Sequence, residues 1–327
     1  MKTKPVLTVL VAAAVALGAC ASLEGRDTSR IDDAAATGSS DDGSTEAQPS
    51  DAQSAATAAA ASIGPFNTRR AMDHVRRLAR RIGVRRRGRY GEYLGAQYIA
   101  RRFRAYGYNV LIRRFSVDGK TSRNVIAFRP DGIRDRFVIG GHMDSVPGSP
   151  GANDNASGVA IILEVARLFA GDPRTKFVRF VAFGSEEYGT DGRHHVGSSN
   201  YVAKRTAGSR RRIPGMVSAD MIADGKPLLV GTSGIGPEVV ARTLYRKIKS
   251  AGIAVSYRTL CDCSDNGPFE HAGIPAAFMW SGYEPNYHDP SDTVPNLNPK
   301  HLNRSGRALV AFMKGLNRDL ISRFRRY

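Results

Sequence analysis

Apolar side chains recur at helical spacing in several parts of this 327-residue chain. Between residues 68 and 82 they alternate with arginines, which predicts an amphipathic helix. A second helix is predicted from residue 91 to residue 106, because Gly107 can end it. Residues 155–171 are apolar nearly all round after a start in small residues, a pattern typical of a buried helix.

Short apolar runs alternate with these helical segments. They predict strands at residues 108–115, 122–128, 135–144, 176–183, 215–222, 227–231 and 274–280. Further helices are predicted at residues 197–205, at residues 236–252, and from Pro299 into the C-terminal arginines. The alternation of strands and helices predicts an α/β fold whose largely parallel sheet is covered by helices.

The first 20 residues are expected to be a lipoprotein signal peptide. Two lysines precede an apolar run that is shorter than the roughly 20 residues a spanning helix needs, which is typical of a secretory signal. The run ends in "LGAC", which resembles the lipobox of bacterial lipoproteins and implies a membrane-anchoring lipid on Cys20. An ordinary cleaved signal is the alternative. Either interpretation predicts export to the bacterial cell envelope, on its periplasmic or extracellular face.

Residues 21–64 form a low-complexity tract of Ala, Ser and Asp without an aromatic side chain, and we expect a disordered tether. The tract carries a net charge of −6 and the signal +2, so the formal total of +18 leaves +22 for residues 65–327. These 263 residues suffice for one domain with a sizeable core, and we predict a single folded domain here.

Ten arginines lie between Arg69 and Arg89. A nucleic-acid partner is not expected, because no aromatic interleaving and no nucleic-acid-binding module is recognisable. A solvated helix face is the favoured interpretation, and contact of this Arg-rich face with anionic lipids or polymers of the envelope is the alternative.

Cys261 and Cys263 remain if Cys20 carries a lipid. Because they are one residue apart, we expect their Cα separation to approach the upper limit for a disulfide, so that only a strained disulfide can form; a free or labile pair is an open alternative. A structural zinc site is not expected, since no second pair of ligands has the required spacing.

Side chains of the metal-binding type follow the predicted central strands. They are His142 with Asp144, Asp154, Glu186 with Glu187, Asp220, and His288. Ligands of open α/β sheets bind at the carboxyl ends of the strands, so these side chains are expected to meet at one edge. Taken singly, each has an ordinary alternative, such as helix capping for Asp154. Together, so many carboxylates would repel one another without cations, which predicts a pair of divalent metal ions.

The mixed oxygen and nitrogen ligands suit zinc, with cobalt or manganese as substitutes. Asp154 is well placed to bridge two ions, and Asp144 is close enough to His142 in the chain to hydrogen-bond its imidazole. Neighbouring side chains on an extended backbone point to opposite sides, so Glu186 and Glu187 are expected to differ in role. One would bind a metal ion, and the other would take a proton from the attacking water.

Five motifs carry a family resemblance. In order, "GGHMDS", "GANDNASGVA", "FGSEEYG", "SADMI" and "YHDPSDT" resemble the co-catalytic di-zinc aminopeptidases of the secreted bacterial leucyl-aminopeptidase type. The resemblance covers essentially all of residues 65–327. It implies a three-layer α/β/α fold with a central, mostly parallel mixed sheet, two Zn²⁺ ions per chain, and peptide substrates.

The resemblance also implies roles for individual residues. It places His142 and Asp220 on one zinc ion, Glu187 and His288 on the other, and Asp154 between the two. It makes Glu186 the general base, Asp144 an orienting partner, and Tyr287 a donor to the carbonyl oxyanion. The sequence departs from the family at Asn266, where histidine is common, and at Asp289, where threonine is usual, which puts the substrate fit in doubt.

An aminopeptidase is therefore the favoured function. A carboxypeptidase or dipeptidase with the same metal ions is the alternative, because the residues that set the direction of attack cannot be located in the sequence. A glutaminyl cyclase is less favoured, since those enzymes use one zinc ion and both ligand sets are complete here. A non-catalytic, receptor-like homologue would have lost ligands, and none is lost.

Overall fold

The structure is a computed structural model that describes residues 63–134 and 136–327. The predicted signal peptide, Cys20 and nearly all of the predicted tether lie outside the described residues. Among the helices of the described part, none combines the length and the apolar character that a membrane span requires.

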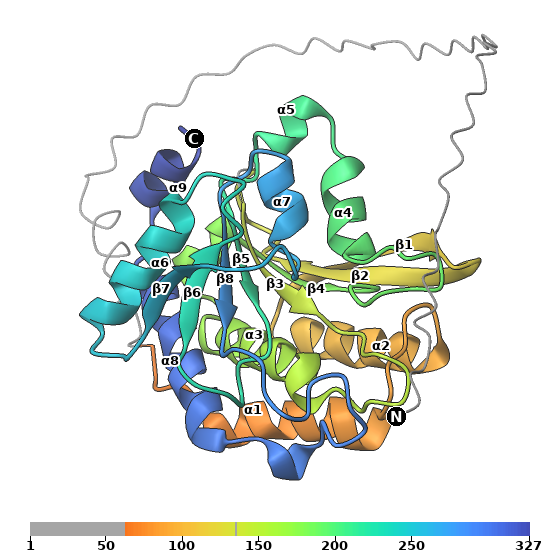
Figure 1. The fold of residues 1–327 in the computed structure, drawn as a ribbon. Helices are drawn as coiled ribbons and strands as arrows, with labels where there is room; N and C mark the ends of the chain where they lie inside the picture. Colours follow the sequence, from red (N-terminus) through yellow and green to blue (C-terminus); the bar gives the residue numbers. More distant parts are fainter. Residues whose placement is uncertain (1–62, 135) are drawn as a thin grey trace, which may run out of the picture. The chain divides into compact units, whose positions relative to one another are not determined.

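Eight strands form one mixed sheet in the order β1-β2-β4-β3-β5-β8-β6-β7 (Figure 1). They are β1 (Asn109–Val117), β2 (Lys120–Phe128), β3 (Phe137–His142), β4 (Val178–Phe183), β5 (Met216–Ala219), β6 (Leu229–Thr232), β7 (Ser256–Thr259) and β8 (Ala276–Trp280). The central strands β4, β3, β5 and β8 run parallel to one another. Their carboxyl ends therefore point to the same edge of the sheet.

Helices cover both faces of the sheet, which confirms the predicted three-layer arrangement (Figure 1). One face carries α1 (Thr68–Val75) with its continuation η2 (Arg76–Ile82), α2 (Tyr90–Ala105), α3 (Gly158–Leu168), α6 (Val239–Ser250), α8 (Pro299–Lys314) and α9 (Arg318–Phe324). The other face carries α4 (Val196–Ala203) and α7 (Gly267–His271), with the short α5 (Ala207–Arg210) following α4.

Strand β4 illustrates why the central strands are apolar at consecutive positions. Phe180 stacks on Phe103 of α2, whereas Phe183 packs against Tyr201 of α4 on the other face. Successive side chains of a strand point to opposite faces, and here both faces are covered by helices. The strand is therefore recognisable by a continuous apolar run rather than by alternation.

The predicted C-terminal helix needs correction, and the short elements α5, α7 and β7 were not predicted. The C-terminal helix does not run unbroken from Pro299, because it ends near Gly315 and α9 begins after Asn317, whose side chain accepts a hydrogen bond from the Leu320 amide at 2.8 Å. The edge strand β7 was not predicted. Its four residues are half-buried or exposed, so its sequence lacks an apolar pattern.

Candidate metal centre

The sheet topology brings the predicted ligands and the predicted base to one edge. The ligands are His142 at the end of β3, Asp154 in the turn η3 (Ala152–Ser157), Glu187 after β4, Asp220 after β5 and His288 after β8, and the base is Glu186 after β4. Their potential ligand atoms form three overlapping groups within which all atoms lie no more than 4.8 Å apart. One group contains His142, Asp154 and Asp220, and another contains Asp154, Glu187 and His288.

Asp154 connects these two groups. Its Oδ1 lies 3.0 Å from Nε2 of His142, and its Oδ2 lies 3.2 Å from Nε2 of His288. Nε2 of His142 lies 3.4 Å from Oδ1 of Asp220, and Nε2 of His288 lies 3.2 Å from Oε2 of Glu187. Ligand atoms that surround one tetrahedral zinc ion at its usual bond lengths are about 3.3 Å apart. The spacing of the side chains thus fits two ions that share Asp154.

Unpaired buried atoms provide a second test of the fit. Oε1 of Glu187 and Oδ1 of Asp220 are buried and have no hydrogen-bond partner. Leaving a buried carboxylate oxygen unpaired is costly, and metal coordination removes that cost. Both atoms belong to carboxylates that face the two histidines, so the residues present fit a pair of divalent cations.

The electrostatics of the centre indicate an excess of negative charge. Burial raises the pKa values of Glu186 and Glu187 well above their ordinary range, and the neighbouring carboxylates add to the effect. Burial alone would lower the pKa of His142, but Asp220 and Glu186 raise it well above its usual value. These carboxylates therefore need positive charge nearby in order to be ionised at neutral pH.

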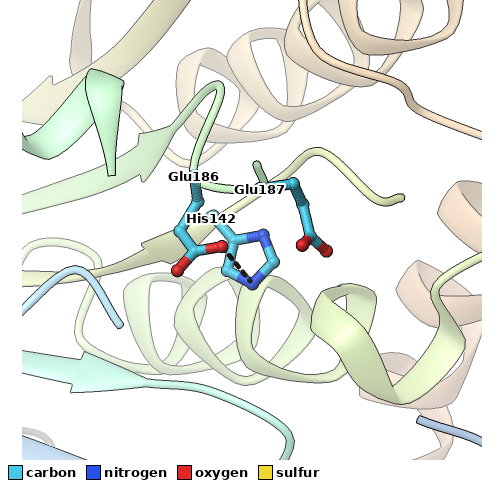
Figure 2. A group of neighbouring side chains, drawn as sticks. All are labelled: His142, Glu186 and Glu187. Carbon is cyan, nitrogen blue, oxygen red and sulfur yellow. Dashed lines mark ion pairs between the residues drawn. The ribbon is translucent and has the colours of Figure 1, made fainter. Parts of the chain in front are cut away.

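The two glutamates of the doublet have different surroundings. Their backbone amides both donate to Asp144, at 3.0 Å from Glu186 and 3.2 Å from Glu187. Figure 2 shows the two carboxylates on either side of the His142 ring, with Glu186 linked to it at 4.0 Å. Glu187 instead contacts His288. Asp144 lies 3.6 Å from Nδ1 of His142, so its hydrogen bonds go to the backbone of the doublet and not to the imidazole.

Two further side chains hold the candidate ligands and were not found by sequence reasoning. The Ser264 hydroxyl donates to Oδ2 of Asp220 at 2.8 Å. Asp292 accepts hydrogen bonds from the amides of Asn153 and Asp154 at 2.7 and 3.0 Å, which orients the turn that carries Asp154. Asp292 lies in the motif "YHDPSDT", but Ser264 has no sequence signal of its own.

Part of the Arg-rich segment supports the site, so the prediction of a solvated face is wrong for Arg85 and Arg87. Arg85 is fully buried and donates to the carbonyl oxygens of Met143 and Gly151, both at 2.8 Å, on the loop between β3 and η3. Arg87 donates to the carbonyl oxygen of Glu187 at 2.8 Å. Both guanidinium groups tie loops next to the candidate ligands to the segment between η2 and α2.

A histidine that the sequence analysis did not single out contacts the doublet directly. Nε2 of His195 lies 2.9 Å from Oε1 of Glu186, and the His195 amide donates to the carbonyl oxygen of Glu186 at 2.7 Å. His195 is buried and directly precedes α4. His194 stacks on Tyr188, which follows the doublet. The histidine pair in "GRHHVG" was the available signal, but its partner could not be known from spacing.

The centre lies in a cavity of about 90 Å³. Tyr287 lines it and stacks on the ring of His288, with 3.8 Å between the ring centres. Cys263 also lines it and forms a disulfide with Cys261. Their Cα atoms are 5.1 Å apart, which lies within the ordinary range for a disulfide. The prediction that the Cα separation approaches the upper limit is therefore wrong.

Comparisons with known proteins point to one family. The model of Peptidase family M28 matches residues 124–313. Aminopeptidase YwaD of Bacillus subtilis is 34% identical over 208 residues, which are 59% of this chain and 44% of that protein. The probable lipoprotein aminopeptidase LpqL of Mycobacterium tuberculosis is 32% identical over 60% of this chain and 45% of its own length. The chain spans about half the length of the curated relatives that it matches.

Solved structures show the same fold. A zinc aminopeptidase from Bacillus subtilis superimposes with a TM-score of 0.70 and 21% identity, covering 76% of this chain and 95% of that one. A glutaminyl cyclase from Fimbriiglobus ruber superimposes with a TM-score of 0.67 and 25% identity, covering 78% of this chain and 97% of that one. The fold is thus shared by proteins with these two different names.

Proposed function

The chain belongs to peptidase family M28, and from this membership we propose that it is a metal-dependent aminopeptidase with two zinc ions. The observation that carries the proposal is the position of Asp154 between His142 and His288. It joins two groups of nitrogen and oxygen ligands at zinc-like spacing. In this proposal His142 and Asp220 would hold one ion, Glu187 and His288 would hold the other, and Asp154 would contribute to both.

The chain's own residues then have distinct tasks in peptide hydrolysis. When bound, the zinc ions would lower the pKa of a water molecule and polarise the scissile carbonyl. Glu186 accepts the proton of the attacking water and delivers it to the leaving amine. His195 holds the Glu186 carboxylate in place through the 2.9 Å contact, and Asp144 holds the backbone of the doublet. The Tyr287 hydroxyl donates to the carbonyl oxygen as negative charge develops there.

The charge of the cavity supports attack at an N-terminal residue. A volume of about 90 Å³ is small, which suits an exopeptidase that acts on either end of a chain. Glu186 and Asp262 line the cavity and are not proposed ligands, so their carboxylates would attract the α-ammonium group of a peptide and repel a terminal carboxylate. This charge favours an aminopeptidase over a carboxypeptidase.

A substrate pair tests the direction of attack. Purified protein is assayed for bound metal by mass spectrometry and for hydrolysis of amino-acyl nitroanilides and their N-acetylated forms. We expect about two zinc ions per chain, and cleavage of the free substrates only. Equal cleavage of blocked substrates contradicts an aminopeptidase, and release of C-terminal residues from N-acetylated peptides identifies a carboxypeptidase.

The proposal extends to the location of the enzyme. Residues 65–327 form the single peptidase domain, residues 21–64 a tether, and residues 1–20 the lipoprotein signal. The lipobox-like "LGAC" supports a lipid on Cys20, and one relative is named a probable lipoprotein aminopeptidase. Radiolabelled palmitate incorporated into the wild-type chain but not into Cys20→Ala would support this anchor, and labelling of both would contradict it.

A further inference from the structure

A second cavity lies at the edge of the sheet opposite to the metal centre. Arg136 directly precedes β3 and Arg179 is the second residue of β4, whereas the candidate ligands follow the last residues of these strands. The cavity has a volume of about 450 Å³, and the loop before β3 and the segment from α4 to β5 complete its walls. Six residues of strand separate the two sites by about 20 Å. The cavity is therefore distinct from the metal centre.

Cationic side chains dominate the lining of this cavity, which we call the arginine cleft. They are Arg113, Arg134, Arg136, Arg179, Lys204, Arg205 and Arg212. The other lining residues among the described ones are Gly132, Ile133 and Ser209, so no described carboxylate faces the cleft.

Several guanidinium groups are held in place without being neutralised. Arg136 is only 8% exposed, lies over the Phe128 ring, and donates to the carbonyl oxygens of Ile133 at 2.6 Å and Gly132 at 2.8 Å. The guanidinium carbon of Arg205 lies 3.9 Å from the centre of the Tyr201 ring. Rings and carbonyl groups orient these charges but leave them positive.

Within the described residues, the cleft cations lack ion pairs with carboxylates. Some arginines elsewhere have such a partner, as Arg129 has Asp131 and Arg76 has Asp73, both at 2.8 Å. In the described part of the chain, none of the seven cleft cations forms an ion pair. Burial lowers the pKa of Arg136, and the positive charge of Arg179 lowers it further. The arrangement is unfavourable until an anion enters.

We propose that the arginine cleft binds a compact anion that carries several phosphate groups. The planar guanidinium fork matches phosphate oxygens in pairs, and a polyphosphate concentrates several charges in a small volume. A volume of about 450 Å³ corresponds to about 15 water molecules, which suits a short oligophosphate or a phosphorylated headgroup. An acidic peptide carries one charge per side chain and matches this density poorly.

Tripolyphosphate binding to the full chain tests this assignment. Calorimetric titration is done at 150 mM salt, after chelation so that the metal centre takes up no phosphate. We expect the dissociation constant to rise at least about tenfold in Arg179→Gln/Arg205→Gln. A second variant, Arg134→Gln/Arg212→Gln, removes two exposed cleft charges. Its effect on the dissociation constant tests the cleft even if the first variant misfolds. Arg80→Gln/Arg81→Gln removes two exposed charges elsewhere and should change binding less than about twofold.

The outcomes separate the site from general attraction by a basic protein. Equal weakening in the cleft and control variants overturns the proposal, as does absence of tripolyphosphate binding by the wild type. A hexaglutamate peptide that binds as tightly as tripolyphosphate overturns the phosphate assignment. The wild type is also sedimented with phosphatidylglycerol vesicles. If tripolyphosphate reverses this sedimentation and the cleft variants lose it, the bound phosphate belongs to a lipid headgroup. Tripolyphosphate binding without such sedimentation assigns it to a soluble ligand.

Discussion

Nε2 of His195 lies 2.9 Å from Oε1 of Glu186, the carboxylate to which we assign proton transfer. The backbone strengthens this link, because the His195 amide also donates to the Glu186 carbonyl oxygen. A buried carboxylate can adopt several orientations, and a fixed donor selects one of them. The contact therefore makes His195 a positioning residue for the proposed base.

Substitution of His195 should act on the catalytic rate and not on substrate binding. We expect His195→Phe, which removes the donor, to lower kcat about 10- to 100-fold with little change in KM. His195→Gln keeps an N–H donor and should recover part of the loss. Steady-state kinetics with an amino-acyl nitroanilide measure both parameters. Equal kcat values for the Phe and Gln variants would show that the hydrogen bond is not the cause.

The two glutamates of the doublet should respond differently to the same change. Glu186→Gln removes the proposed proton acceptor and should lower kcat about 10²- to 10⁴-fold while bound zinc is retained. Glu187→Gln removes a proposed ligand and should lower the zinc content itself. Metal analysis and kinetics on both variants distinguish the roles. Full activity in Glu186→Gln, or unchanged metal in Glu187→Gln, would contradict the assignment.

Asp292 provides a test of how the bridging carboxylate is held. It accepts hydrogen bonds from the amides of Asn153 and Asp154, and Asn at this position can accept only one of them well. We expect Asp292→Asn to weaken zinc binding about 10- to 100-fold although no ligand is lost. Competition with a fluorescent chelator measures the affinity. Asp289→Asn, an exposed change three residues earlier, is the matched control and should leave the affinity unchanged.

The predicted ligands were recognisable because each follows an apolar strand of a parallel sheet. His142 is the last residue of β3, and Asp220 directly follows β5. The topology of the sheet alone brings their side chains together. The apolar runs of β3, β4 and β8 were equally clear, since helices bury both faces. Local pattern and the rule for parallel sheets thus account for most of the fold, for the five candidate ligands and for the candidate base Glu186.

The supporting residues were not predictable, because their partners are distant in sequence. Ser264 and Asp220 are separated by 44 positions, and Arg87 and Glu187 by 100. Arg85 belongs to an arginine run whose other members include exposed side chains, and composition cannot show which member turns inward. Only the packing of the loop between β3 and η3 onto the segment between η2 and α2 determines that Arg85 is buried.

Removal of metal should destabilise the protein. Without cations the buried carboxylates of the centre repel one another, and a ligand that binds only the folded state stabilises it. At a metal concentration of about 100 times Kd this amounts to about 2.7 kcal/mol, or about 5–10 °C in Tm. Calorimetry with and without chelator measures the shift. Asp154→Ala should show a much smaller shift, and an equal one would place the stabilising ion elsewhere.

His74 should make stability depend on pH between about 4 and 6.5. It is buried, with Nδ1 2.5 Å from the Tyr98 hydroxyl, and burial together with the charge of Arg102 lowers its pKa to about 4. The unfolded chain, with a pKa of 6.5, binds the proton more tightly in this window. The contribution of neutral His74 is therefore complete above pH 6.5 and is lost as the pH falls towards 4.

The size of this effect can be measured against a variant that does not titrate. The shift predicts a loss of about 2 kcal/mol in the free energy of unfolding between pH 7 and pH 5. Urea unfolding of chelated wild type and His74→Gln across this range isolates the contribution, because both proteins retain the carboxylates of the metal centre. Between pH 7 and pH 5, the free energy of unfolding should fall by about 2 kcal/mol more for the wild type than for His74→Gln. Parallel pH profiles would show that His74 is protonated equally in the folded and unfolded states.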